Sequence, residues 1–353
     1  MATIRQQPAA FSLSGQLNDI VVYTNAQRCR VEVMCDSDTL LDETLYPDSD
    51  GLITIAELSQ LIAPYARRDL VVTLMAKVSE LDSDGTATAT VSTDVATVLC
   101  CAADTGTTAQ EFCSSHFLTT LNGTKITAMG REERLYAYDA TAVSITADVV
   151  KEPGVIEARQ ATLTAASTTK GVSAFFVSPD NVAALLGLVS ERLLGYTVTA
   201  GQRVQMFSVA EDSVSPAPVF AFINSFGCLE FLHCNGKHLK ESKYSRQTAR
   251  FRGVRRNYLI EEDRQFTANT GALNQWMADW ADEVMRSYEV YLWVDGRRGR
   301  QVVVTDSKSD IDNLPDSMPA FELTYGYAQR NHNVMQPSHA GRIFDNTFDH
   351  TFE

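Results

Sequence analysis

Two groups of residues have types and spacings that suit a metal ion. The first is the acidic segment 46–57, in which Gly51 falls at the sixth position of an EF-hand calcium loop. This alignment puts three carboxylates at positions three, five and twelve: Asp48, Asp50 and Glu57. Tyr46 takes the first position, which needs a carboxylate, and residues 30–35 are typical of a strand where an entering helix is required. We therefore expect no calcium site here.

The second group is a pair of histidines beside Asn235-Gly236, a dipeptide that favours the type I′ turn of a β-hairpin. With that turn His233 lies opposite His238, close enough for two imidazoles to share a metal. The next pair on this face, Phe231 with Lys240, supplies no third ligand. We interpret the histidines as a partly exposed pair, and we expect the protein to use no metal and no cofactor.

Signatures of catalysis are missing from the sequence. It contains no nucleophile elbow, no paired-histidine metalloprotease motif and no glycine-rich phosphate loop. Adjacent carboxylates such as Glu132-Glu133 and Glu261-Glu262 occur among mixed charges, which is typical of a solvated surface. A glycan-active enzyme is a distant alternative, because the two carboxylates of a glycosidase leave no local signature. We predict a protein without catalytic residues that is not an enzyme.

The composition is that of a globular protein that folds in the compartment where it is made. Its 353 residues allow two or three domains, and 44% hydrophobic with 21% charged residues is ordinary. No apolar run approaches the roughly 18 residues of a membrane helix, and the N-terminus lacks the apolar core of a secretory signal. We predict that the seven cysteines, an odd number with Cys100 and Cys101 adjacent, are reduced and buried.

The net charge of −14 is unevenly distributed along the chain. Residues 1–100 carry 14 Asp and Glu against 6 Lys and Arg, a net charge of −8. Residues 237–264 carry 9 Lys and Arg against 4 Asp and Glu, a net charge of +5. We define a basic stripe in this segment by six residues: Lys243, Arg246, Arg250, Arg252, Arg255 and Arg256. The stripe is either a solvated face or a surface that meets the acidic region of another subunit. The overall negative charge argues against nucleic-acid binding.

Hydrophobic patterning predicts a mainly β protein built of tandem antiparallel β-sandwich-like domains with a few helices. We expect an N-terminal β domain at 1–103, a middle β domain at 104–217, a C-terminal α+β domain at 218–330 and an arm at 331–353. Within the first domain, Asp84-Gly85 favours a hairpin turn. The last domain ends in an alternating strand with Phe321, Leu323, Tyr325 and Tyr327 on one face.

Helix signals are fewer and lie between the strands. Thr54 and Glu57 have capping-box spacing ahead of an apolar helical face, and Pro64 limits the length of that helix. A second helix begins at Pro179 and continues through Leu193 to Gly195. The longest helix is expected near 271–288, with one buried face: Leu273, Trp276, Met277, Trp280, Val284 and Tyr288.

The C-terminal half also contains three recognisable segments. They are Phe222-Ile-Asn-Ser-Phe-Gly227 followed by Glu230, residues 318–322 leading to 327–333, and residues 341–352. Over about 215–353 the chain resembles a family of tail structural proteins encoded by phages and prophages of gut anaerobes. The resemblance implies a tail-tip or baseplate subunit, distal or close to the hub, that assembles in the bacterial cytoplasm into a ring and with other tail proteins. It transfers no catalytic or ligand-binding residue.

A carbohydrate-binding or adhesive β-sandwich protein is the alternative function. Exposed aromatic residues along a groove would favour that alternative. Subunit contacts that bury the basic stripe and the C-terminal arm would favour the structural role.

The arm ends in a four-residue repeat that places Phe344, Phe348 and Phe352 on one face of a strand, or roughly aligned on a helix. Its Asp and Thr content favours the strand. Burial of each phenylalanine contributes about 1.5–3 kcal/mol relative to exposure, so we expect the arm to dock on another subunit. The alternative is that the arm folds back on its own domain.

Deletion of residues 343–353 should therefore leave a folded, soluble monomer that no longer assembles, because the apolar anchor is lost. Light scattering after size-exclusion chromatography measures this directly. A truncated protein that still forms the native oligomer would contradict the prediction.

Overall fold

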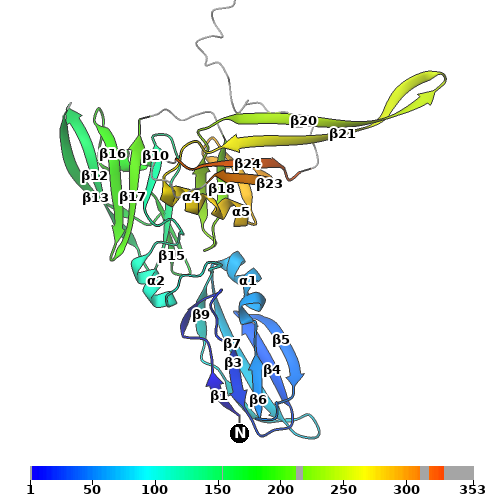
Figure 1. Ribbon diagram of the computed structural model, residues 1–353. Coiled ribbons are helices and arrows are strands. Elements are labelled where there is room, and N and C mark those ends of the chain that lie inside the picture. Colours follow the sequence, from blue (N-terminus) through cyan, green and yellow to red (C-terminus); the bar gives the residue numbers. More distant parts are fainter. Residues whose placement is uncertain (1, 153, 212–217, 311–317, 330–353) are drawn as a thin grey trace, which may run out of the picture.

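The computed structural model describes residues 2–152, 154–211, 218–310 and 318–329, and it confirms the predicted class: a mainly β protein with several antiparallel sheets. We name its parts by the predicted boundaries as the N-terminal module (to residue 103), the middle module (from 104) and the C-terminal module (from 218). The N-terminal module forms one end of the molecule, and the other two modules lie side by side at the opposite end (Figure 1). The predicted arm, with Phe344, Phe348 and Phe352, lies outside the described residues.

The N-terminal module is a sandwich of two sheets. The smaller sheet has the order β1 (Thr3–Gln6), β3 (Ile20–Tyr23), β6 (Leu52–Ile55). The larger has the order β2 (Phe11–Leu13), β9 (Ala96–Leu99), β7 (Val71–Leu81), β4 (Cys29–Cys35), β5 (Asp38–Leu45), with β8 (Ala87–Ser92) also paired to β7. The helix α1 (Leu58–Asp69) packs on the same core through Ile62 and Ala66. The predicted turn is present between β7 and β8, where Gly85 has φ +84°.

Two details of the predicted first helix are wrong. Thr54 belongs to β6, and Glu57 precedes the helix in a left-handed conformation without a side-chain cap. Pro64 lies inside α1 rather than near its end. The helix continues past Pro64 because Ile62 and Ala66, on either side of it, are both fully buried in the core.

The middle module also has two sheets. The larger has the order β10 (Thr124–Ala128), β17 (Arg203–Ala210), β16 (Arg192–Ala200), β12 (Ala142–Glu152), β13 (Val155–Thr164). The smaller has the order β11 (Arg134–Tyr138), β15 (Val172–Phe176), β14 (Ser167–Thr169), and the helices are α2 (Ala109–Ser115) and α3 (Pro179–Leu185). The predicted helix to Gly195 is wrong beyond Leu185, because Leu193 pairs with Val149 in the sheet and is buried there.

The C-terminal module is built on one seven-stranded sheet. Its order is β19 (Leu229–His233), β18 (Val219–Ile223), β22 (Val290–Val294), β23 (Arg297–Asp310), β24 (Ala320–Tyr327), β21 (Val254–Asn269), β20 (His238–Phe251). The rings of Phe220 on β18 and Tyr325 on β24 have centroids 5.0 Å apart, although a flat sheet would separate these strands by about 14 Å. The sheet therefore curls around its core, and the predicted alternating strand is confirmed as β24.

Two short helices, α4 (Gln275–Ala281) and α5 (Glu283–Arg286), pack on the curled sheet in place of the single long helix predicted near 271–288. Asn274 starts α4 by accepting the Met277 N–H, and the helical segments meet at Asp282. Trp276 and Tyr288, which the periodicity placed on the buried face, are both exposed. Tyr288 lies beyond α5, where the helix has ended. Among the described helices, none has the length and apolar composition needed to cross a membrane.

Asn235-Gly236 does not form the predicted hairpin turn. The strands on either side of it, β19 and β20, are at opposite ends of the sheet order. The Asn235 N–H instead donates to Thr270 O at 3.1 Å, and the Gly236 N–H to Asn269 O at 2.9 Å. The turn preference is overridden because β20 pairs with β21 along its whole length, which supplies a far longer hydrogen-bond ladder.

All three modules meet at one apolar core, which we call the junction core. It contains Leu13, Val71, Leu99 and Cys101 from the N-terminal module, Ala109, Phe112, Cys113, Leu118 and Val172 from the middle module, and Phe226 and Cys228 from the C-terminal module. The Phe226 ring stacks on Phe112, with centroids 5.1 Å apart. The junction core thus joins residues that are more than 200 positions apart.

A tight turn carries Phe226 into the junction core. The Asn224 side chain accepts the N–H groups of Phe226 and Cys228, both at 2.9 Å, and donates to Leu118 O at 2.9 Å. The Ala102 N–H donates to Ser225 O at 2.7 Å. Gly227 has φ +76°, and a Cβ there would lie 2.7 Å from Leu70 Cδ2. The turn is therefore fixed by contacts to both other modules.

Phe226→Ala should lower the free energy of unfolding by about 3–5 kcal/mol, because it removes a fully buried ring and leaves a cavity between three modules. Phe251→Ala is the matched control, since that ring is 63% exposed; we expect a change of less than about 0.5 kcal/mol. Denaturant unfolding measures both. Equal effects of the two substitutions would contradict the role given to the junction core.

Candidate interaction surface

The acidic segment 46–57 serves backbone turns in this fold. It follows the strand β5, whereas an EF-hand loop follows a helix. The Asp48 carboxylate accepts the N–H groups of Asp50 at 2.9 Å and Leu52 at 2.8 Å. Across the described ranges, no group of three or more His, Cys, Asp or Glu side chains is arranged to hold a metal ion.

The two histidines diverge, so the predicted cross-strand pair is wrong. His238 stacks against Phe266, and its Nε2 lies 3.0 Å from the Tyr325 hydroxyl. The His233 side chain is 8% exposed, and its Nε2 lies 3.3 Å from Glu132 O. Burial, with Lys125 and Arg131 nearby, holds the pKa of His233 well below its ordinary value, so this ring is neutral.

Glu133 was expected on a solvated surface, but it is buried between the middle and C-terminal modules. Lys125 Nζ donates to Glu133 Oε2 at 2.6 Å and to Phe231 O at 3.2 Å, and it lies 4.3 Å from the centroid of the Trp280 ring. Lys125 on β10 therefore contacts both β19 and α4. Burial raises the pKa of Glu133, and the neighbouring Lys125 opposes that rise.

A second buried carboxylate, Glu230, lies on β19 in the same interface. It accepts hydrogen bonds from Asn224 Nδ2 at 2.7 Å and from the Trp280 indole N–H. Burial raises the pKa of this carboxyl as well. The adjoining cavity, lined by Lys125, His233 and Trp280 among others, has a volume of only about 20 Å³. This is room for about one water molecule, so we interpret the buried charges as joining the two modules.

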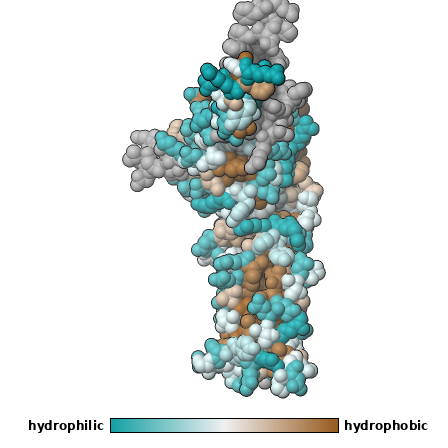
Figure 2. Space-filling view, turned by 90° about the vertical axis from the view of Figure 1, so that its right-hand side faces the viewer, coloured by the Kyte–Doolittle hydropathy of each residue, from teal (hydrophilic) through white to brown (hydrophobic). Residues whose placement is uncertain are grey.

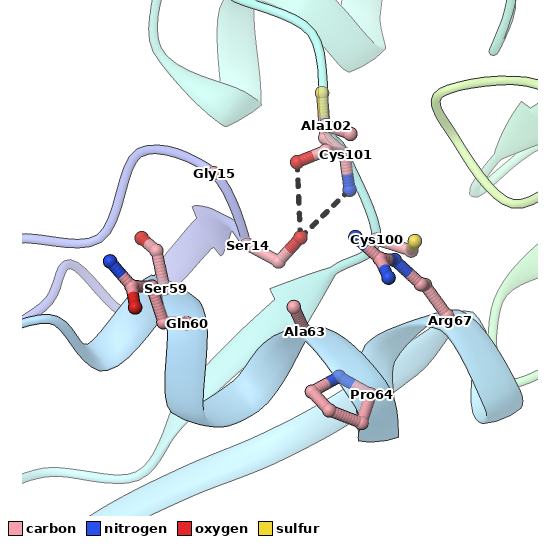
Figure 3. Close-up of a pocket in the computed structure, with 10 residues that line it drawn as sticks. All are labelled: Ser14, Gly15, Ser59, Gln60, Ala63, Pro64, Arg67, Cys100, Cys101 and Ala102. Atoms are coloured by element: carbon pink, nitrogen blue, oxygen red, sulfur yellow. Dashed lines mark hydrogen bonds between the residues drawn. The ribbon is translucent and has the colours of Figure 1, made fainter. Parts of the chain in front are cut away.

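A larger hollow of about 390 Å³ lies beside α1 (Figure 3). The Ser14 hydroxyl there accepts a hydrogen bond from the Cys101 N–H at 2.9 Å and donates one to Cys101 O at 3.1 Å. Burial raises the pKa of Cys100 to about 11 and of Cys101 to about 12, so both thiols are protonated at neutral pH and are weak nucleophiles. Arg67 at the rim stacks on Tyr288, 4.0 Å from the ring centroid, and so joins α1 to the C-terminal module.

All seven cysteines are buried, and none forms a disulfide bond.

The six residues of the basic stripe all lie on one long hairpin, formed by β20 and β21. Only residues 266–269 of β21 pair with β24. Beyond them the two strands pair with each other alone, and the hairpin projects from the body of the molecule (Figure 1). The chain reverses at Arg252-Gly253, where both residues have positive φ.

Strand alternation divides the hairpin into two faces with different charge. One, which we call the basic face, carries five cations and one anion: Lys240, Arg246, Arg250, Arg255, Arg264 and Glu262. Its side chains contact one another, as in Arg255 Nε to Thr248 Oγ1 at 2.9 Å. The other, the mixed face, has both signs: Lys243, Arg256, Glu241 and Glu261. Arg255 and Arg256 of the predicted stripe therefore point to opposite sides.

Large apolar side chains are also exposed on the hairpin. They are Leu239 near the root and, further out, Tyr244, Phe251, Val254, Tyr258, Leu259 and Ile260. Tyr244 and Ile260 belong to the basic face, where Arg246 lies 5.0 Å from the Tyr244 ring centroid. The charge of this segment was predicted from the sequence, but its exposed apolar component was not. The run Tyr258-Leu259-Ile260, set within a strongly charged segment, was the signal that could have shown it.

Comparisons with known proteins identify no family. No family model matches the sequence, and no curated protein matches it. Among solved structures, a chain described as "Crystal Structure of Rst D1-D2" is 10% identical with a TM-score of 0.23, covering 59% of this chain and 98% of that one. A second, from work on surface retention of a bacterial ice-binding adhesin, is 9% identical with a TM-score of 0.19, covering 76% and 92%. Likeness at this level carries no functional argument.

Lys125→Met should destabilise the protein by about 3–5 kcal/mol near neutral pH, because it leaves Glu133 buried without its cation. Burial already raises the pKa of Glu133 above its ordinary value of 4.5. A folded-state pKa above the ordinary value contributes stability that is complete at low pH and is lost as pH rises through the folded-state pKa. Removing Lys125, which opposes the rise, shifts the pKa of Glu133 further upward. The destabilisation by Lys125→Met should therefore be smaller at about pH 5 than at about pH 8.

The matched control is Lys125→Met combined with Glu133→Leu, which removes both charges and should recover most of the stability. Urea unfolding at both pH values measures the effect. A loss that is independent of pH, or that persists in the double variant, would contradict the assigned ion pair.

Proposed function

We propose that this protein is a structural subunit of a phage tail tip or baseplate, distal or close to the hub, which assembles with copies of itself and with other tail proteins. The observation that carries the proposal is the projecting hairpin with its exposed apolar and basic residues. A two-stranded ribbon without further packing is only marginally stable in water. We infer that the ribbon is covered by another subunit in the assembled particle.

The rigid attachment of the hairpin supports a structural role. Phe266 at its base is buried and stacks on Tyr325 of β24, with centroids 5.1 Å apart. The same core holds α4, whose Trp280 contacts Lys125 of the middle module. The hairpin is therefore fixed to a base that includes two modules, as a part that must meet a defined neighbour requires.

The segments that carry the family resemblance contribute to this base. Residues 222–227 include the turn that inserts Phe226 into the junction core. Residues 318–322 begin β24, which pairs with the root of β21. Residues 330–333 of the second segment, and the whole third segment, 341–352, lie outside the described residues. The two described segments thus connect the modules and anchor the hairpin, which is consistent with an assembly subunit.

A carbohydrate-binding or adhesive protein is the alternative. It would place exposed aromatic rings along a groove, whereas Tyr244, Phe251 and Tyr258 lie on an open ribbon. The partly exposed ring of Trp276 packs on Gly123, so closely that a Cβ on Gly123 would clash with it, and it therefore serves a contact within the protein. The positions of these rings favour assembly over glycan binding.

Joining Ser242 to Arg264 through Asn-Gly removes the projecting part of the hairpin and leaves its root paired with β24. We expect a folded protein whose unfolding free energy changes by less than about 1 kcal/mol, because the removed residues are mostly exposed. In particles from a phage that carries the gene, gold-labelled antibodies should mark the tail tip with the intact protein and not with the shortened one.

Phe251→Ala, at the exposed end of the hairpin, is the control for an altered surface with an intact ribbon and should still be incorporated. Absence of the intact protein from purified particles would contradict the tail function. Incorporation of the shortened protein would contradict the role of the hairpin alone.

A further inference from the structure

We propose that the basic face of the hairpin binds the N-terminal module of a second copy of this chain, along the open side of its sandwich between β5 and β6. This inference rests on the proposed assembly role and names its partner. It follows from charge, apolar exposure and the separation of the two surfaces within one molecule.

The hairpin offers a surface of one sign. Five cations against one anion give the basic face a net charge of +4, and Arg252 at the turn adds to it. The only anion, Glu262, is engaged by Arg264 and by the Tyr244 hydroxyl at 3.2 Å. Exposed Tyr244 and Ile260 lie between the cations. A partner must therefore supply both carboxylates and apolar contacts.

The N-terminal module has both features. Its first 100 residues carry a net charge of −8. The strands β5 and β6 are the free edges of its two sheets and are consecutive in the chain, so they border one open side of the sandwich. Partly exposed leucines follow this side: Leu40, Leu41, Leu45 and Leu52. Figure 2 shows an apolar strip along this module, between hydrophilic borders.

Acidic residues accompany these leucines. Asp38, Asp42 and Glu43 lie on β5, and Asp50 lies in its connection to β6; all four are exposed. Asp42 is paired with Arg30 at 2.7 Å, and Asp38 is 3.9 Å from Arg68. Among the described residues, Glu43 and Asp50 have no cation within ion-pair distance. The open side thus has carboxylates available to cations from outside.

A second copy is required because one molecule cannot bring these surfaces together. The hairpin projects from the C-terminal module at the end of the molecule opposite the N-terminal module (Figure 1). The lengths are also compatible. The eleven residues of β20 beyond its root span about 37 Å, and the eleven residues of β7 give the sandwich the same length. Every copy then both provides and receives a hairpin, as in a closed oligomer or a ring.

The test compares charge reversals on the two faces of the hairpin in the full-length protein. One variant reverses Arg246, Arg250 and Arg255 to Glu on the basic face, and its matched control reverses Lys243 and Arg256 to Glu on the mixed face. Sedimentation velocity should show at least about tenfold weaker self-association for the first and less than about threefold for the second. Raising the salt concentration from about 50 to 500 mM should also weaken the self-association of the intact protein, because salt screens the contact between opposite charges.

A third variant, Asp38→Lys, Glu43→Lys and Asp50→Lys, reverses the receiving surface. It should also self-associate weakly, but mixed with the basic-face variant it should form heteromers. The intact hairpin of one variant then meets the intact acidic surface of the other, and the two reversed surfaces are also of opposite charge. Circular dichroism checks that each variant is folded.

Equal effects of the two hairpin variants, or no heteromer in the mixture, would overturn the inference, as would an intact protein that stays monomeric. None of these results bears on whether antibodies find the protein at the tail tip. The proposed function can therefore stand or fall separately.

Discussion

The insertion of Phe226 between the modules is the contact on which the rest of the arrangement depends. Its turn is held by Asn224, closed by Gly227 and bonded to Ala102 and Leu118 of the preceding modules. A side chain of this size cannot be buried in three modules at once unless all three keep one relative orientation. The junction core thereby converts three separately built β structures into one body.

Buried charge gives the second contact, between the middle and C-terminal modules, a specificity that apolar packing lacks. Lys125 must meet Glu133, the Phe231 carbonyl and the Trp280 ring together, because a buried ammonium that loses a partner is strongly destabilising. Any slip between β10 and β19 would separate these groups. The ion pair therefore fixes the register of the interface, whereas the junction core supplies its apolar stabilisation.

The projecting hairpin, unlike these two interfaces, leaves its apolar side chains exposed. Inside the module Phe266 and Ala268 of β21 are buried, while a few residues further out Ile260 and Tyr258 are exposed on the same strand. The strand keeps its hydrogen-bond ladder but loses the neighbouring strand and the helices that cover its base. The proposed assembly role is based on this uncovered ribbon, and the proposed contact is assigned to the basic face because the two faces differ in charge.

Local signals in the sequence determined the elements whose stability is local. The alternation through Phe321, Leu323 and Tyr325 predicted β24, because the side-chain period is a property of neighbouring residues. Asp84-Gly85 predicted the turn between β7 and β8 for the same reason, since a positive φ is a preference of the residue itself. The sequence also placed the excess of positive charge in one segment.

Tertiary structure decided everything that depends on distant partners. Asn235-Gly236 forms no hairpin turn because β20 pairs with β21 instead. The helix ends at Leu185 because Leu193 pairs with Val149 in the sheet. Glu133 is buried because it pairs with Lys125 beneath the C-terminal module. Only the strand register separates Arg255 from Arg256, since it assigns each side chain to a face. These outcomes depend on free energies of contacts across the chain, which no local pattern contains.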